Sequence, residues 1–128
     1  MYLKNYQLNK AWLVKIVILV VAYFLAAKLG LLMAFKETNA SPVWAPTGLA
    51  LAAVLIWRYK VWPGIFIGAF LANVVTFIGN DLPATTSILM SCGIGIGNTL
   101  EAVVGAYLII RFVRCSDPFL TSRGILKF

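Results

Sequence analysis

The sequence contains no histidine, only two cysteines and only four acidic residues. Without histidine, the chain has no histidine metal ligand, no histidine-bound haem and no histidine for acid–base catalysis. Cys92 and Cys115 would lie roughly 30 Å apart along a helix, which is too far for a disulfide bond. Paired carboxylates, a P-loop, a Cys-x-x-Cys motif and a nucleophile with its base are missing too. We therefore expect no enzymatic activity, no metal site and no cofactor in this chain.

Charged residues are also scarce, at 12% of the chain against 62% apolar residues, and the mean hydropathy is +0.92. Soluble domains are roughly 45–50% apolar. A compact soluble domain of 128 residues could not bury so much apolar surface, so lipid must be the solvent for much of it. The composition predicts an all-α integral membrane protein whose partner is the lipid bilayer.

Apolar runs separated by short polar segments predict about four membrane-spanning helices, at about residues 11–35, 43–57, 61–79 and 87–112. The expected organisation is a cytoplasmic N-terminus at 1–10, a four-span membrane segment at 11–112 and a cytoplasmic tail at 113–128 that leads to further spans. A cleaved signal peptide is the alternative for the first run. That run is longer than an ordinary signal core, and more spans follow it.

The net charge of +7 comes from basic residues beside and between the apolar runs, not from one basic patch, so we expect no nucleic-acid partner. One side of the membrane would hold Lys4, Lys10, Arg58, Lys60, Arg111, Arg114, Arg123 and Lys127. The other would hold Lys36 with Glu37 and Asp81. By the positive-inside rule both termini are cytoplasmic, and Trp12, Trp57, Tyr59 and Trp62 are anchors at the cytoplasmic interface.

Small residues recur at four-residue spacing in every span, and we expect the helices to pack through them. The glycines in these stripes are Gly30, Gly48, Gly64, Gly68, Gly93, Gly97 and Gly105. In the last span, Glu101 continues the stripe of Gly93, Gly97 and Gly105 on one helix face. Function is therefore expected near this face.

Polar side chains within the spans are Lys28, Asn73, Asn98 and Glu101. Glu101 is expected roughly 16 Å deep, near the midplane of a core about 30 Å thick, whereas Lys28 lies roughly 10 Å from the outer end and can snorkel. Each alone would be an uncompensated charge in hydrocarbon, so one hypothesis pairs Lys28 with Glu101, directly or through water.

Three roles stay open for Glu101. It holds helices together, it belongs to a ligand or signal pocket, or it is protonated at rest and senses pH or passes protons. In the last case Asn98 or Asn73 would be its hydrogen-bond partner.

A second polar stretch runs from Ser41 to Gly48 and contains two prolines. Pro46 disfavours helix at Ala45, and irregular backbone at membrane depth is tolerated where it faces protein or a wet cavity. Trp44 is then either an interface anchor or a pocket wall. The candidate ligand or signal site comprises Lys28, Trp44, Pro46, Thr47, Asn73, Asn98 and Glu101.

Several short motifs occur in a characteristic order over about residues 20–128. They are Ala27-Lys28-Leu29-Gly30-Leu31, Trp44-Ala45-Pro46-Thr47-Gly48, Val61-Trp62-Pro63-Gly64-Ile65, Gly68-Ala69-Phe70-Leu71-Ala72-Asn73, the segment from Gly97 to Ala106, and Pro118-Phe119. In this order they resemble the first type of the membrane-associated sensor (MASE) domain family of bacteria.

The resemblance implies a multi-pass sensory input module of the bacterial inner membrane. Such modules precede cytoplasmic output domains, typically histidine kinase, PAS or cyclic-di-GMP enzymes such as diguanylate cyclases, and so serve two-component and related signal transduction. The family domain has about eight spans, so this chain resembles its N-terminal half, without an output domain. The expected partners are an unknown small ligand and further copies of the protein, which associate through output domains or helix packing.

Two other functions remain open. One is a proton-coupled small-molecule transporter or half-transporter, since glycine-interrupted spans and a lone membrane acid suit that class. Small multidrug exporters, however, carry this acid in the first span, whereas Glu101 is in the fourth. The other is a structural membrane scaffold whose only activity is oligomerisation.

Overall fold

The computed structural model describes residues 10–32 and 44–113, and they form four α-helices and one short 3-10 turn. The helices are α1 (Lys10–Leu32), α2 (Ala45–Trp57), α3 (Trp62–Gly79) and α4 (Ala84–Val113), with the turn η1 (Tyr59–Val61) between α2 and α3. The described residues include no strand, so the predicted all-α class is confirmed.

Helices α1, α3 and α4 are long and apolar enough to cross a membrane, whereas α2 is shorter. The 13 residues of α2 extend about 20 Å, less than the hydrocarbon core of about 30 Å. Trp44 has φ −103° and ψ 83°, which is not helical, and Pro46 follows in the first turn of α2, where a missing N–H costs little. Within the described residues, the predicted second span is helical from Ala45 onward.

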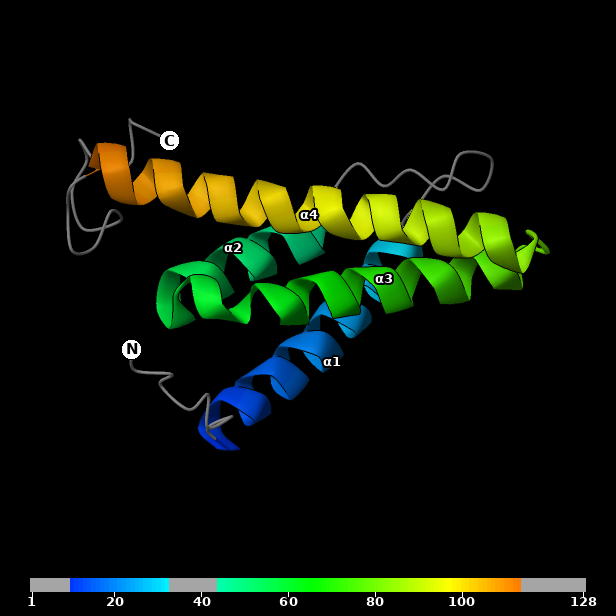
Figure 1. Ribbon diagram of the computed structural model, residues 1–128, viewed down its shortest axis with the longest axis horizontal. Helices are drawn as coiled ribbons and strands as arrows, with labels where there is room; N and C mark the ends of the chain where they lie inside the picture. Colours follow the sequence, from blue (N-terminus) through cyan, green and yellow to red (C-terminus); the bar gives the residue numbers. More distant parts are fainter. Residues whose placement is uncertain (1–9, 33–43, 114–128) are drawn as a thin grey trace, which may run out of the picture.

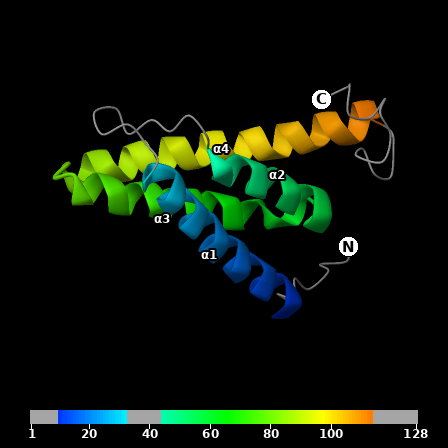
Figure 2. The ribbon, with the colours of Figure 1, turned by 180° about the vertical axis from the view of Figure 1, so that it is seen from behind.

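The four helices pack in a ring in which α3 contacts α4 and α1, and α2 contacts α4 and α1. Figures 1 and 2 show α3 and α4 lying side by side over most of their length, with α1 inclined across them. The shorter α2 covers only part of α4 (Figure 1).

The first residue of α2 lies near the middle of the bundle. A Cβ atom added to Gly105 would stand 3.3 Å from Leu51 Cδ1, so these residues are level with each other. Helices α2 and α4 run in the same direction (Figure 1), which brings Ala45 level with about Thr99, halfway along α4. Such an interruption inside a membrane bundle requires protein around it, because lipid cannot hydrogen-bond the free backbone groups.

Close helix contacts form at several of the glycines expected to mediate packing. A Cβ on Gly68 would stand 2.8 Å from Tyr23 Cβ, and one on Gly64 would stand 3.0 Å from Leu19 Cδ2. Gly30 is buried, and Gly105 faces Leu51 as described above. The face of α3 that carries Gly64 and Gly68 therefore lets α1 approach closely, as in other membrane helix pairs.

The structure differs from the sequence prediction at the other three glycines. Gly48, Gly93 and Gly97 are exposed, and a Cβ on any of them would meet no atom of the described chain within 4 Å. Helix α4 instead turns a neighbouring stripe inward, made of Ser87, Ser91, Gly95, Ala102 and Ala106. Gly95 was not expected to pack, yet its Cβ position lies 3.1 Å from the Phe66 ring.

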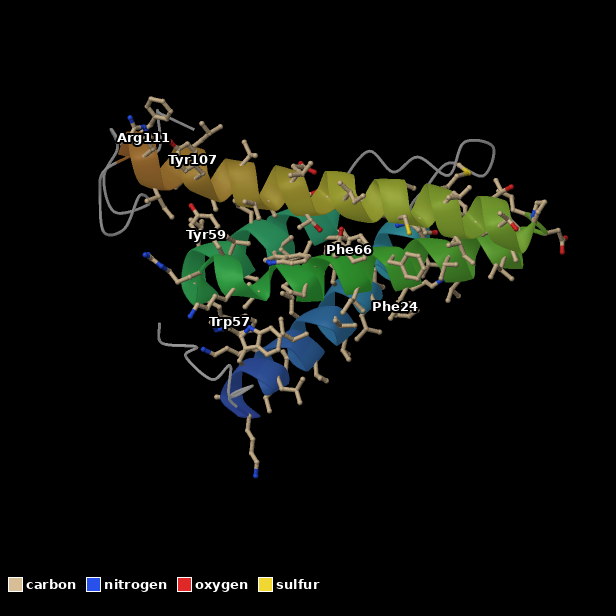
Figure 3. The ribbon with its side chains drawn as sticks, viewed as in Figure 1. Phe24, Trp57, Tyr59, Phe66, Tyr107 and Arg111 are labelled. Carbon is tan, nitrogen blue, oxygen red and sulfur yellow. The ribbon has the colours of Figure 1, made fainter. Side chains whose placement is uncertain are left out.

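Aromatic and basic side chains gather at one end of the bundle. Trp12 Nε1 donates a hydrogen bond of 2.9 Å to the Lys60 carbonyl, and Lys15 Nζ lies 6.0 Å from the Trp57 ring centre. Figure 3 shows Trp57, Tyr59, Tyr107 and Arg111 toward this same end. This grouping is typical of an interfacial belt. That this end is cytoplasmic stays a prediction.

Glycine contacts provide a matched test of the packing. We expect Gly68→Ala to destabilise the fold by about 1–3 kcal/mol, because the new Cβ overlaps the rigid Cβ of Tyr23. Gly48→Ala should leave stability unchanged or raise it by up to about 1 kcal/mol, since its Cβ would meet no described atom within 4 Å and only helix propensity changes there. Unfolding in mixed micelles measures both, and equal changes would contradict the close contact at Gly68.

Membrane orientation can be tested with single cysteines in a chain lacking Cys92 and Cys115. We expect Asp81→Cys to react with a membrane-impermeant maleimide in intact cells, because the loop before α4 should be outside. Lys60→Cys should react only after the membrane is permeabilised. Both positions are exposed, so the reversed pattern would show that the orientation is opposite.

Candidate functional site at the start of helix α2

The residues of the predicted polar site fall into two separate groups. Lys28 and Asn73 lie toward the end of the bundle where α1 and α3 finish. The remaining five lie in α4 and around the first turn of α2, and they are Trp44, Pro46, Thr47, Asn98 and Glu101. The structure therefore brings together most of the predicted site but leaves two members outside it.

Lys28 obtains its contacts from α1 and α3. Its Nζ donates a 3.1 Å hydrogen bond to Thr76 Oγ1 and lies 5.6 Å from the Phe24 ring centre. Thr76 in turn donates to the Ala72 carbonyl at 2.7 Å. Lys28 is near the C-terminal ends of two helices, where the partial negative charge of free carbonyls favours a cation. The ammonium thus gains stabilisation without an acidic partner.

Asn73 is buried on α3 and uses its side chain locally. Its Nδ2 donates a 2.8 Å hydrogen bond to the Ala69 carbonyl one turn earlier. Nearby, Lys28, Thr76 and Asn80 line an open recess of about 510 Å³ together with apolar side chains. The polar groups at this end of the bundle therefore make their main hydrogen bonds within α1 and α3.

The expected direct pair between Lys28 and Glu101 is not formed. Gly95 of α4 faces Phe66 of α3, and these helices run in opposite directions. From this level, Thr76, the partner of Lys28, lies ten residues away in one direction and Glu101 six residues away in the other. At about 1.5 Å per residue, about 24 Å separates their positions along the bundle.

Among the described residues, no side chain caps the start of α2. Trp44 occupies the N-cap position without a side-chain hydrogen bond, and Pro46 has no N–H to donate. The Thr47 N–H donates to the Trp44 carbonyl at 3.2 Å. Trp44 and Thr47 are half-buried, and Pro46 is buried. The position of Trp44 near the middle of the bundle favours the pocket-wall interpretation over the interface anchor.

Tyr23 of α1 is the functional candidate that the sequence did not reveal. It is 0% exposed, and its hydroxyl has no hydrogen-bond partner within the described chain. The Trp44 side chain packs against the core cluster that contains Tyr23. A buried phenol usually finds a partner. A tyrosine inside an apolar span was the available signal.

Glu101 lies on the flank of α4 and is exposed, while Asn98 one turn earlier is half-buried. Since Gly105 is level with Leu51, Asn98 and Glu101 are level with Trp44 and Thr47 at the start of α2. No hydrogen bond or ion pair from either side chain to another described residue is present. An acid and an amide are thus available beside the interruption of the second span.

A metal site would need several ligating side chains close together. Within residues 10–32 and 44–113, no group of three histidine, cysteine, aspartate or glutamate residues comes together. Cys92 is a half-buried free cysteine on α4, and Cys115 lies outside the described residues. The polar groups at the start of α2 are suited to hydrogen bonding rather than to metal coordination.

Three long apolar helices, a fourth that begins inside the bundle and an aromatic belt at one end define a helical membrane protein. The MASE1 family model matches residues 16–128, which is most of the chain. The chain belongs to the MASE1 family, which is a family of membrane-associated sensory domains.

A curated relative is DgcE of Escherichia coli (strain K12), described as a probable diguanylate cyclase. It is 33% identical to this chain over 81 residues, which are 63% of this chain but 7% of the relative. The chain therefore spans only a small part of the length of that protein. No solved structure matches the chain.

A double-mutant cycle tests the separation of Lys28 from Glu101. We expect Lys28→Met and Glu101→Gln to change the free energy of unfolding additively, within about 0.5 kcal/mol, because the groups are far apart. Lys28→Met and Thr76→Val should instead show a coupling of about 0.5–3 kcal/mol, since their side chains are bonded. Unfolding in mixed micelles gives all the values. Strong coupling of Lys28 to Glu101 would contradict the observed arrangement.

Proposed function

We propose that this chain is the input segment of a bacterial signalling protein and controls a cytoplasmic output domain, a diguanylate cyclase or a histidine kinase. The observation that carries the proposal is the MASE1 match over residues 16–128. The partial similarity to a probable diguanylate cyclase favours the cyclase as output. A module of this kind acts from the bacterial inner membrane as a multi-pass protein.

The interrupted second span is the element that we propose to transmit the signal. Helix α2 contacts both α1 and α4, so a change at its first turn alters two helix contacts at once. A signal shifts the packing only if it favours one arrangement over another. Asn98 and Glu101 are level with this turn and bond to no other described residue, so they supply the means for such a preference.

Association between copies is also part of the proposal. The exposed face of α4 carries Gly93 and Gly97, whose Cβ positions have no neighbour within 4 Å in the described chain. Small residues of this kind let a second membrane helix come close. Glu101 continues the same face and is better placed against protein or water than against lipid. A homo-oligomer would cover it.

A fusion to a diguanylate cyclase domain tests the sensory role. The chain should change cyclic-di-GMP in cells several-fold relative to the same cyclase domain anchored by a single unrelated membrane helix. In the same fusion, Trp44→Ala should change the cyclic-di-GMP level relative to the wild-type chain, because it alters the first turn of α2. Trp62→Ala is the matched control at the exposed interfacial position and should leave the output near wild type.

Two results would contradict the proposal. Output identical to that of the single-helix anchor would show that the chain is only an anchor. Equal effects of Trp44→Ala and Trp62→Ala would show that the start of α2 has no special part in signalling. Quantitative immunoblots of each fusion exclude differences in protein amount.

A further inference from the structure

An open recess lies where the last turn of α1 meets the last turns of α3. Figures 1 and 2 show that α3 and α4 continue beyond the end of α1, which leaves a step at this place. The recess measures about 510 Å³, within the range of about 300–1,000 Å³ that is usual for ligand clefts. Its lining includes the polar residues Lys28, Thr76 and Asn80 and the apolar residues Leu31, Leu32 and Val75.

The ammonium group of Lys28 has hydrogen-bonding capacity that the fold does not use. It carries three N–H groups, and one of them donates to Thr76 Oγ1. The Thr76 hydroxyl gives its own proton to the Ala72 carbonyl, so its oxygen is fixed as the acceptor that holds the ammonium at the recess. Among the described residues, Lys28 bonds to no second acceptor and to no carboxylate. A positive charge with donors to spare therefore lines the recess.

The surroundings of this ammonium favour an anion. None of the described residues that line the recess is acidic. Asp81 is exposed and does not line it, and Glu101 lies about 24 Å away along the bundle. The backbone N–H groups of residues 80–82 already bond to the last carbonyls of α3, which reduces the repulsion of an anion by this helix end.

The apolar wall of the recess faces lipid rather than protein. Leu32 is 82% exposed and Val75 is 48% exposed. The span Tyr59–Gly79 has 21 residues, which at about 1.5 Å per residue equals the thickness of the hydrocarbon core, about 30 Å. Gly79 therefore lies near the boundary between hydrocarbon and head groups, and Thr76 lies one turn deeper. A molecule that fits has an anionic head at this level and an apolar tail beside the exposed wall.

We propose that this recess binds one anionic phospholipid. Its phosphate accepts hydrogen bonds from Lys28 Nζ and from the Asn80 amide, and an acyl chain packs against Leu32 and Val75. Lysine binds phosphate as a compact positive charge. A soluble anion would gain the same head-group contact but none of the apolar contact, so it binds less tightly. The bound lipid joins α1 to α3 at the end of the bundle opposite the aromatic and basic side chains.

Dioleoylphosphatidylglycerol is the probe, and native mass spectrometry of the purified chain, released from neutral detergent micelles, counts the bound lipid. We expect one saturable molecule per chain. Lys28→Met removes the charge and should weaken this binding about tenfold, which corresponds to about one hydrogen bond to a charged group. Lys28→Arg keeps the charge and should retain the binding. Lys15→Met makes the same chemical change on α1 at an exposed position outside the recess and should bind like wild type.

Three matched ligands test the chemistry. Dioleoylphosphatidylcholine has the same chains and phosphate but no net charge, glycerol 3-phosphate has the phosphate without chains, and oleate has a chain with a carboxylate. Each should bind less tightly than dioleoylphosphatidylglycerol in wild type. Binding of any of them that is as tight and as dependent on Lys28 would overturn the proposal, because the site would then select a zwitterion, a free phosphate or a fatty acid. Equal binding of dioleoylphosphatidylglycerol by wild type and Lys28→Met, or an equal loss in Lys15→Met, would overturn it too.

Thermal unfolding in the same micelles is a second measurement. A lipid that binds only the folded chain stabilises it, so dioleoylphosphatidylglycerol should raise the Tm of wild type, Lys28→Arg and Lys15→Met. The same rise in Lys28→Met would contradict the site. Circular dichroism confirms that each variant retains its helices. Both measurements use the chain alone, so their results are independent of whether the chain alters the output of a fused cyclase.

Discussion

The close approach of α1 to α3 at Gly68 is the contact on which the central part of this bundle depends. Because Gly68 has no Cβ, the Tyr23 backbone comes near α3 and its aromatic ring is enclosed by the bundle. Helix α1 also contacts α2, so the position of α1 affects α2 as well. A larger residue at position 68 would move α1 outward and loosen both contacts.

The polar groups of the bundle are stabilised in two different ways. Lys28 lies where helices end, so helix dipoles, Thr76 and an aromatic ring together stabilise its charge. Glu101 lies in the middle of a helix, where no free helix end of α4 is near, and it has no bonding partner within the described chain. Lys28 lies near helix ends and Glu101 does not. This difference explains why the Lys28 charge has partners within these four helices and the Glu101 charge has no bonding partner there.

Sequence periodicity predicted the helices well because apolar length is a strong signal in membranes. Three of the four expected spans correspond to long helices, with ends that differ by a few residues. The proline stretch was less accurate: Pro46 was expected to disfavour helix at Ala45, yet Ala45 is the first residue of α2, because proline is tolerated in the first turn of a helix. The glycine stripe was less informative. Four-residue spacing places Gly93, Gly97 and Glu101 on one face of α4, but spacing does not say which face turns inward.

The correct inward face of α4 depends on its neighbours. Ser87, Ser91 and Gly95 are as small as the residues of the outer stripe, so size alone did not distinguish the two faces. The pairing of Lys28 with Glu101 failed for a related reason, because depth estimates from helix ends ignored the offset between α1, α3 and α4. Tyr23 was missed because its importance comes from what surrounds it. The register and crossing of helices are set by contacts between residues that are far apart in the sequence. A single sequence therefore does not reveal them directly.

An interrupted helix inside a bundle has a consequence for signalling that a continuous span would not have. A continuous helix satisfies its own backbone and is indifferent to small polar molecules nearby. The first turn of α2 has no side-chain cap among the described residues, so its stability depends on what lies next to it. Since α2 contacts α1 and α4 directly, a change at this turn alters the packing of three helices. That arrangement connects the start of α2 with the position of α4, the last helix that the structure describes.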